Sequence, residues 1–326
     1  MAVNVSSTKL SIWRTCPFLF YLIYVEKIRV PKWIKFVFGS AVHRTIAGFY
    51  RLNEKQRKKR LEQKTKKKQT LLFPQSKKGA IGLWIRNWKE VTQNKAEIRF
   101  DPGKSPDKQI QNLLELGASM VGKYWEDNFE APFPMAVEER FKIPVPGIDG
   151  VALVGSIDQI RKIGGEYWLV DLKTSWQDYG MQDPRIQYPV HHNYQFTIYS
   201  LAFRIRHGKT EAGIIRYPLG YKGTSPVTGE KIDKSVIVTP RQIEDYVDLI
   251  LFISVFLDNC DKGLFFKNFG DHCTICDYQE ICSTWKITST PIPVGELKWG
   301  KIDPEKVIAL LEEKARELSF KQPRLF

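Results

Sequence analysis

The sequence of 326 residues contains no long apolar run. The longest one covers residues 249–257, is interrupted by Ser254, and is too short to span a bilayer. The chain begins without a basic segment followed by an apolar stretch, which argues against a secretory signal. We therefore expect a cytoplasmic protein with no membrane segment.

Cysteine is also scarce, with five residues in the chain. In an intracellular protein such a set is typical of metal ligands or free thiols rather than disulfides. Neither an internal repeat nor a Gly/Ser-rich linker divides the sequence. Its hydrophobic content of 43% is enough for a sizeable core, and its charged fraction of 26% argues against global disorder.

The net charge of +14 is concentrated in one segment. Residues 51–78 contain twelve Lys or Arg and two Glu, so this segment supplies +10 of the total. A basic stretch of this kind indicates a polyanionic partner, with nucleic-acid phosphates as the first candidate. The alternative is a solvated charge run without a partner. Phe73 is the one aromatic residue in the stretch, so base stacking is not expected there.

The pattern of apolar residues changes from helical to strand-like near residue 131. Helical periodicity dominates residues 9–50, where Ser11 is the expected cap, and returns in residues 80–129. Strands are predicted at residues 137–145, 151–160, 167–172, 212–217 and 234–239. Further helices are predicted at residues 194–206, 240–257 (capped by Thr239) and 303–318. This order predicts an α+β fold with a mixed central β-sheet flanked by helices from both ends of the chain.

Two acids and a lysine stand out against the apolar strands. Asp158 ends the run VALVGSID, and Asp171 and Lys173 lie in YWLVDLKTS. An ionised carboxylate beside apolar strand residues costs desolvation energy unless it is paired or binds a cation. If the two strands are neighbours, Asp158 and Asp171 converge on one Mg²⁺, which prefers oxygen ligands. Asp171 and Lys173 are two residues apart and therefore share a face of the strand.

Such a group is suited to phosphodiester hydrolysis. A cation held by the acids activates a water and offsets the negative charge that develops on the phosphate. Lys173 is the candidate for holding the attacking water and helping to deprotonate it. The alternative is an ordinary hairpin with an acid at its turn and an Asp–Lys pair at its rim, because the pattern D-x-K alone is common.

The segments GSID and LVDLKTS, which contain these residues, resemble motifs II and III of the PD-(D/E)XK nucleases, in particular the RecB-like exonuclease group. The resemblance implies a restriction-endonuclease-like mixed sheet in which Asp158, Asp171 and Lys173 bind metal and catalyse. The Pro of the family name is replaced here by Ile157.

Two further motifs follow the order of the same family. FGSAVHRTIAGFY is similar to its helical motif I, which implies that His43 is a metal ligand. YQFTIYSLAF resembles its Q-x-x-x-Y element, which implies that Gln195 and Tyr199 border the site and contact the nucleic acid. Gln195 and Tyr199 are four residues apart and share a helix face. Taken singly, each has a structural alternative, as a buried histidine or an ordinary helix surface.

The cysteines form a one-plus-three pattern. Cys273, Cys276 and Cys282 have the spacing C-x2-C-x5-C, and Cys16 lies far upstream. The surrounding SIWRTCPFLFYLIY is similar to the N-terminal Cys-Pro-aromatic motif of the family. The four cysteines resemble the [4Fe-4S] site of its AddB-type and CRISPR-associated nucleases. This resemblance implies an iron–sulfur clasp that joins the N- and C-terminal segments.

Zinc bound by the same four cysteines is the alternative to the cluster. Structural zinc sites usually have two close pairs of ligands, whereas Cys16 has no nearby ligand partner in the sequence. His272 is a weaker candidate ligand because it adjoins Cys273. Cys260 belongs to no motif, and we expect it to be a free thiol.

Together with the resemblance, the sequence predicts a Mg²⁺- or Mn²⁺-dependent deoxyribonuclease with a [4Fe-4S] cluster. Exonuclease action in DNA processing, recombination or repair is favoured. The alternatives are a non-catalytic iron–sulfur DNA-binding subunit and a structure-specific or RNA-directed endonuclease. We expect one integrated domain with four sections. They are an N-terminal helical section (residues 1–50), a basic helical insertion (51–130), the nuclease core (131–240), and C-terminal helices with the cysteines (241–326).

DNA is the expected partner. Because no G-x-x-x-x-G-K-[ST] motif occurs, any unwinding requires a helicase or recombination protein. The chain ends in Gln322, Pro323, Arg324, Leu325 and Phe326. This ending loosely resembles the pentapeptide by which replication proteins dock on bacterial sliding clamps, and the alternative is a frayed terminus.

Overall fold

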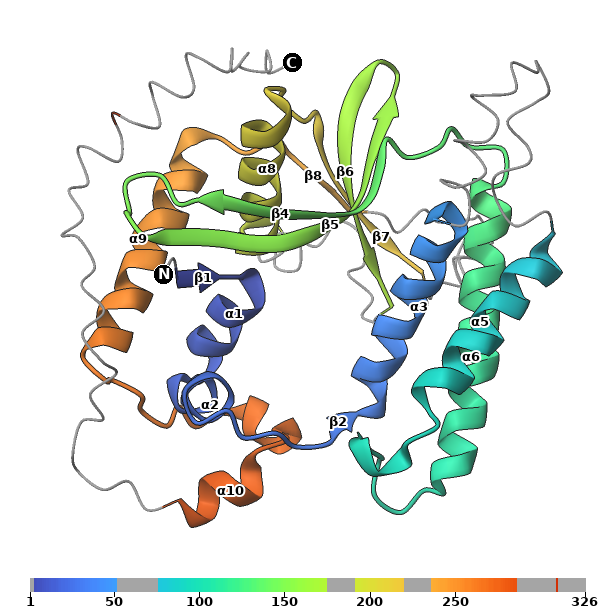
Figure 1. The fold of residues 1–326 in the computed structure, drawn as a ribbon, viewed down its shortest axis with the longest axis horizontal. Helices are drawn as coiled ribbons and strands as arrows, with labels where there is room; N and C mark the ends of the chain where they lie inside the picture. Colours follow the sequence, from blue (N-terminus) through green and yellow to red (C-terminus); the bar gives the residue numbers. More distant parts are fainter. Residues whose placement is uncertain (1–2, 52–75, 175–190, 220–235, 286–308, 310–326) are drawn as a thin grey trace, which may run out of the picture.

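A computed structural model describes the chain over residues 3–51, 76–174, 191–219 and 236–285, together with residue 309. A mixed β-sheet runs through its centre, and helices cover both of its faces (Figure 1). The predicted α+β class with a helix-flanked mixed sheet is thus confirmed. The strands of the sheet are β1 (Val3–Val5), β4 (Ala136–Pro144), β5 (Val151–Ile163), β6 (Glu166–Lys173), β7 (Gly213–Pro218) and β8 (Val236–Val238).

The long strand β5 organises the sheet. β4 pairs antiparallel with one edge of β5 over most of its length. On the other edge, β1 pairs in parallel with residues 151–153, and β6 pairs antiparallel with residues 159–163. β7 continues the sheet in parallel with β6, and β8 pairs antiparallel with β7. Asp158 therefore lies on this edge between the part of β5 that pairs with β1 and the part that pairs with β6.

Helices pack on the sheet in two groups (Figure 1). Their bounds are α1 (Ser7–Thr15), α8 (Tyr194–His207) and α9 (Ile243–Asp261) in one group, and α3 (Ile34–Arg51), α5 (Lys77–Val91) and α6 (Pro106–Asn128) in the other. Because side chains alternate along a strand, β6 contributes to two cores. Leu169 packs with the first group, whereas Val170 and Leu172 pack with the second.

A third, smaller core joins the N-terminal segment to the cysteine-rich segment. Its elements are α2 (Pro17–Phe20), a π-helical turn (Tyr21–Val25), a 3-10 turn (Asp271–Ile275) and α10 (Gln279–Thr284). Phe18 and Tyr21 pack there with Tyr278. The Phe18 amide donates to the Phe266 carbonyl at 3.0 Å, and the Tyr278 hydroxyl donates to the Ile28 carbonyl at 2.8 Å. Packing and hydrogen bonds thus link segments that lie about 250 residues apart in the sequence.

A short parallel ladder ties the α3 layer to the same cysteine-rich segment. It consists of β2 (Lys32–Trp33) and β3 (Ile98–Arg99), and a 3-10 turn (Lys95–Glu97) precedes β3. The Arg99 guanidinium lies over the Trp33 ring at 4.7 Å from its centroid and 3.3 Å from a carboxylate oxygen of Asp277. Arg99 therefore bridges the helical layer and the cysteine-rich segment.

The first helix begins earlier than predicted. β1 has only three residues, too few to give an alternating pattern, and the chain turns into α1 directly after it. The hydroxyl of Ser6 accepts the Lys9 amide at 3.2 Å and caps the helix. Ser11, the predicted cap, lies inside α1 instead.

The start of α9 also differs from the prediction. Gln242 precedes the helix, and its amide donates to the Asp245 carboxylate at 2.8 Å. This bond is part of the cap of the helix. The capping residue is thus Gln242, three residues after the predicted cap at Thr239. Pro240 consequently lies before the helix rather than in its first turn.

Several predicted features fall outside the described residues. They are most of the basic stretch 51–78, nearly all of the helix predicted at 303–318, and the C-terminal residues 322–326. Within the described ranges, no helix combines the length and apolar character that crossing a membrane requires.

Candidate active site

Three acids lie in one row across β4, β5 and β6. Glu138 and Asp158 lie between two β4–β5 pairs, Val137 with Gln159 and Glu139 with Ile157, so the register places them opposite each other. The β5–β6 register, extended by one step beyond its last pair, places Asp171 opposite Asp158 on the other edge. Directly opposed residues of antiparallel strands project from the same face of a sheet. Strand pairing therefore brings together three carboxylates that are well separated in the sequence.

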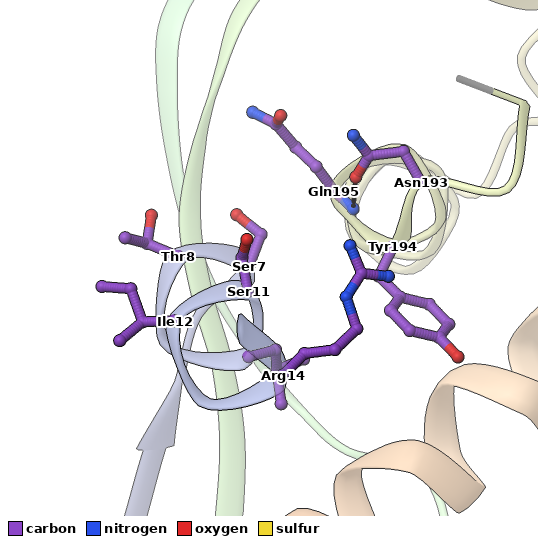
Figure 2. A pocket seen from close by; sticks show the side chains of 9 residues that line it. Ser7, Thr8, Ser11, Ile12, Arg14, Asn193, Tyr194 and Gln195 are labelled. Atoms are coloured by element: carbon purple, nitrogen blue, oxygen red, sulfur yellow. Dashed lines mark hydrogen bonds between the residues drawn. The ribbon is translucent and has the colours of Figure 1, made fainter. Parts of the chain in front are cut away.

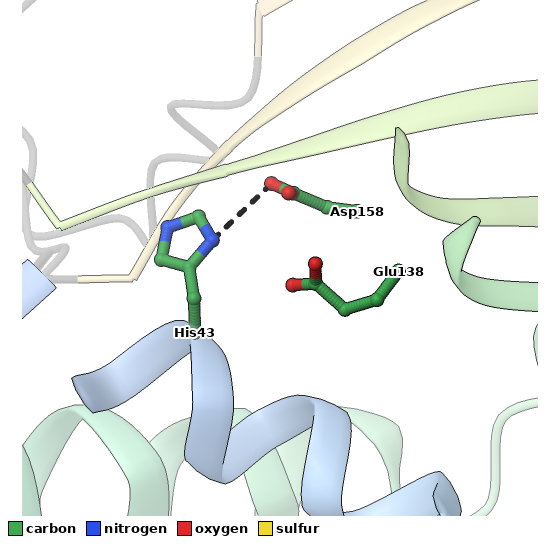
Figure 3. A group of neighbouring side chains, drawn as sticks. All are labelled: His43, Glu138 and Asp158. Atoms are coloured by element: carbon green, nitrogen blue, oxygen red, sulfur yellow. Dashed lines mark ion pairs between the residues drawn. The ribbon is translucent and has the colours of Figure 1, made fainter. Parts of the chain in front are cut away.

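Asp158 is the centre of this acid row (Glu138, Asp158 and Asp171). Its Oδ2 atom accepts a hydrogen bond of 2.8 Å from the Leu172 amide and lies 3.4 Å from Nδ1 of His43. Figure 3 shows the His43 ring rising from α3 toward Asp158, with the Glu138 carboxylate beside it. The ligand atoms of His43, Glu138 and Asp158 all lie within 4.8 Å of one another. These three side chains define a site of the size that one cation requires.

The contact with Asp158 controls the charge of His43. Burial alone lowers the pKa of an imidazole. The hydrogen bond to Asp158 and the negative charges of Asp158 and Asp171 outweigh that effect, and the pKa of His43 is raised. A cation that binds here must displace the proton of His43, because a ligating imidazole is neutral.

Glu138 is a site residue that the sequence analysis does not identify. Its backbone φ of 49° lies in the left-handed region, which residues other than glycine rarely adopt. The Ser156 hydroxyl donates to its Oε2 at 3.2 Å. The adjacent Glu139 is instead bound by Arg206 and His207, at 3.3 and 2.9 Å. The sequence shows two neighbouring acids, but only the strand register tells which of them enters the row.

Asp171 and Lys173 share one face of β6, as their spacing predicts. The Lys173 Nζ atom lies 3.0 Å from Oδ1 and 2.9 Å from Oδ2 of Asp171. Burial raises the pKa of Asp171 to about 6, although Lys173 opposes the shift, and the nearby charge of Asp158 adds to it. Asp171 is therefore an acid whose protonation is sensitive to the charge placed beside it.

Gln195 and Tyr199, on one face of α8, complete the connected group. The Gln195 side-chain oxygen accepts a hydrogen bond from Lys173 at 3.3 Å. Its amide nitrogen donates to Asp171 at 3.3 Å and to the Tyr199 hydroxyl at 2.7 Å. Burial, together with the charges of Asp171 and Asp158, raises the pKa of Tyr199 well above its usual value, so the phenol stays neutral. Tyr199 thus orients Gln195, and Gln195 orients Lys173.

The residues present fit a hard divalent cation such as Mg²⁺ or Mn²⁺. Carboxylate oxygens are the preferred ligands of these ions, and an imidazole extends the choice to transition metals. The Asp171 Oδ2 atom is buried and accepts no well-directed hydrogen bond from the described residues, despite its contact with Lys173. This oxygen remains available as a ligand. All six residues that the resemblance assigns to catalysis and metal binding lie in this one group, and their roles remain predictions.

Three of the four cysteines of the one-plus-three pattern lie in the third core, and Cys273 lies in the 3-10 turn beside it. Cys16, Cys276 and Cys282 belong to its apolar cluster. Burial raises the pKa of Cys276, and the neighbouring thiols of Cys16, Cys273 and Cys282 raise it further. Among the described cysteines, no three bring their sulfur atoms within 4.8 Å of one another. The structure therefore does not show a cluster, and the [4Fe-4S] assignment stays a prediction.

Cys260 lies elsewhere, in the core under α9. Its side chain is buried, and burial, with the charge of Asp261, raises its pKa to about 12. A thiol in such surroundings is unreactive. This environment agrees with the expectation of a free thiol. The Nε2 atom of His272 donates to the Asn268 carbonyl at 2.8 Å.

Comparison with known proteins identifies the family. The family model described as PD-(D/E)XK nuclease superfamily matches residues 4–283. Among curated proteins, none matches the chain. A solved structure titled "Crystal structure of SSO0001" is 19% identical over 62% of this chain and 79% of that chain, with a TM-score of 0.30, which is too low to support an inference. The family match includes the whole acid row, and the chain belongs to the PD-(D/E)XK nuclease superfamily, whose members are typically metal-dependent nucleases.

Proposed function

We propose that the protein is a Mg²⁺- or Mn²⁺-dependent DNA exonuclease of the RecB-like group. The observation that carries the proposal is the acid row, with His43 beside its central residue Asp158 and Lys173 beside Asp171 at one end. A nuclease needs ligands for a cation and a positive side chain next to it, and both are present within one hydrogen-bonded group. DNA as substrate and exonuclease as mode rest on the motif resemblance.

The proposed cation ligands are His43, Asp158 and Asp171, with Glu138 as an additional oxygen donor. The other three side chains surround Asp158, from α3, β4 and β6. A divalent cation held there polarises the scissile phosphate and lowers the pKa of a bound water. The Leu172 amide fixes the Asp158 carboxylate by a hydrogen bond, so this ligand is oriented before any cation binds.

Lys173 is proposed to hold the attacking water and to stabilise the negative charge that develops on the phosphate. The Lys173 side chain is 29% exposed, whereas the Asp171 side chain is 1% exposed, so the lysine lies on the solvent side of the pair. The Gln195 oxygen restrains the ammonium from the α8 side. A charge that is positioned before reaction stabilises the transition state without the cost of reorganisation.

We further propose a [4Fe-4S] cluster bound by Cys16, Cys273, Cys276 and Cys282. Burial, and after it the charges of the neighbouring thiols, raises the pKa of Cys276, and a cationic cluster would offset both effects. The ligands of a cluster bind different iron atoms, so their sulfurs lie farther apart than the ligands of one ion. Zinc with the same ligands is distinguished by metal analysis of the purified protein.

The proposed setting is DNA processing, recombination or repair in the cytoplasm, with a helicase or recombination protein supplying any unwinding. Docking of Gln322, Leu325 and Phe326 on a sliding clamp is part of this proposal. A pulldown with the clamp tests it: capture that survives deletion of residues 322–326 contradicts it.

The test of function compares linear single-stranded DNA, labelled at either end, with circular DNA of the same sequence. With Mn²⁺ we expect loss of the linear DNA, survival of the circle, and full inhibition by EDTA. Degradation of both forms identifies an endonuclease. Binding without degradation of either form, with iron present in the protein, identifies a non-catalytic subunit.

A further inference from the structure

A polar pocket lies between α1 and the start of α8, next to the acid row. Its volume is about 260 Å³. Its lining comes from two helices: Ser7, Thr8, Leu10, Ser11, Ile12 and Arg14 of α1, and Asn193, Tyr194 and Gln195 at the start of α8. Figure 2 shows the guanidinium of Arg14 reaching from α1 toward Asn193 and Tyr194.

Polar residues of α1 make up much of the lining of this pocket. Ser7, Ser11 and Arg14 are spaced four and three residues apart, so they share one face of the helix. Leu10 also lines the pocket, and Trp13 is buried in the core. A helix face that meets another helix is normally apolar. Here α1 presents hydroxyls and a guanidinium to α8, and a hollow remains between the two helices.

Arg14 supplies positive charge to the pocket. Within the part of the chain that the structure describes, its guanidinium makes no ion pair with a carboxylate. The guanidinium lies over the Tyr194 ring, 6.0 Å from its centroid. Tyr194 is itself held by stacking on Phe252, at 4.8 Å between the ring centroids. A planar guanidinium without a carboxylate partner is suited to a phosphate, to which it donates two parallel hydrogen bonds.

Gln195 joins the pocket to the proposed catalytic centre. Its side chain lines the pocket and also contacts Lys173 and Asp171 of the centre. A group bound in the pocket therefore lies one side chain away from the acid row. The small volume suits the backbone of one nucleotide and excludes a double helix.

We propose that this pocket binds the phosphodiester backbone of a single DNA strand at the nucleotide next to the scissile phosphate. Arg14 pairs with that phosphate, and the Ser7 and Ser11 hydroxyls donate hydrogen bonds to its oxygens. The inference rests on the proposed function and adds the strand form of the substrate. It assigns α1 to substrate binding, in addition to its role in the core.

The experiment measures binding without cleavage. Fluorescence anisotropy follows a labelled 12-nucleotide oligothymidylate with the full protein in Ca²⁺, for wild type, Arg14→Gln and Arg14→Lys. Arg86→Gln is the matched control, because Arg86 is an exposed arginine on the separate helix α5. We expect Arg14→Gln to bind about tenfold more weakly, Arg14→Lys to show a smaller loss, and the slope of log Kd against log salt to decrease by about 0.7 in Arg14→Gln.

Equal binding by Arg14→Gln and Arg86→Gln overturns the pocket assignment. If the wild type still degrades DNA in Mn²⁺ in that case, the proposed function stands and only the pocket fails. If the wild type neither binds the oligonucleotide nor degrades DNA, both fail. Tighter binding of a blunt duplex than of the single strand by the wild type also contradicts the pocket assignment.

Discussion

The acid row and the cysteine-rich segment are held together in opposite ways. In the row, each charged group has a polar partner from the protein: Leu172 for Asp158, Lys173 for Asp171, and Ser156 for Glu138. In the cysteine-rich segment, aromatic packing dominates, with Phe18 near Trp285 and Tyr21 near Phe265.

The thiols of that segment have few polar contacts. Cys273, for example, has one contact of 3.8 Å, to the Asn268 carbonyl. The protein thus supplies the polar partners of the acid row by itself, and under the proposed function we expect the thiols to need a metal group for the same purpose. Removing metal from the acid row should therefore change activity, and removing metal from the cysteines should change stability.

The largest effect is expected for Cys276→Ser. Loss of one ligand should abolish iron binding and lower the unfolding midpoint on the order of 10 °C, because the metal then no longer links the N- and C-terminal segments. Iron content, visible absorption and thermal unfolding of anaerobically purified protein measure this. Cys260→Ser is the control and should retain its iron, since Cys260 lies in a different core. Stoichiometric zinc without iron in the wild type would contradict the cluster.

The next effect concerns Glu138, the acid that only the register identifies. Glu138→Gln should weaken Mn²⁺ binding about tenfold, because a charged oxygen donor becomes a neutral one. Glu139→Gln, one residue along, should leave Mn²⁺ affinity unchanged, since Glu139 is bound by Arg206 and His207. Isothermal titration of both variants decides the point. Equal losses in the two would remove Glu138 from the site.

The raised pKa of Asp171, about 6, makes metal binding dependent on pH. A proton on Asp171 competes with the cation below that value, so Mn²⁺ affinity should rise about fivefold from pH 5 to pH 6. Because the pKa of His43 is also raised, loss of its proton should extend the rise to higher pH. Without metal, the folded state binds this proton more tightly than the unfolded state, so its stability should fall as pH rises from about 4 to 6. Mn²⁺ titrations at four pH values test this, and a constant affinity would contradict it.

The smallest effect is expected for Tyr199→Phe. Loss of the hydroxyl removes the acceptor that orients Gln195, which in turn contacts Lys173. We expect kcat to fall about threefold to tenfold with KM unchanged, because Tyr199 positions Gln195 and binds no ground-state group. Gln195→Ala should have a larger effect of the same kind. A change in KM alone would assign Tyr199 to substrate binding.

The sequence predicted which residues come together better than it predicted how they are arranged. Asp158, Asp171 and Lys173 could be found because charged residues in apolar strands need partners, and Gln195 because a helix spacing aligned it with Tyr199. Glu138 could not be found because its place in the row depends on the register of β4 against β5. A shift of one residue would have brought Glu139 into the row instead.

Other features depend on tertiary packing that no local pattern encodes. The pocket between α1 and α8 forms only when two segments almost 190 residues apart come together. The sequence did not indicate the cap at Ser6. The strand β1 that precedes it has three residues, too few for an alternating pattern that would mark where the strand ends and the helix begins. The presence of a core on each face of the sheet could be predicted, because a strand with apolar residues on both faces must be covered by helices on both sides.

The most direct measurement is degradation of end-labelled linear DNA in Mn²⁺ by wild type, Lys173→Ala and Lys142→Ala. Lys142 is an exposed lysine on β4 and controls for the loss of a positive charge. We predict that Lys173→Ala loses at least about 10³-fold in rate while it keeps its fold and its Mn²⁺ site, and that Lys142→Ala matches the wild type. Equal rates for Lys173→Ala and the wild type would contradict the assignment of this site as the nuclease centre.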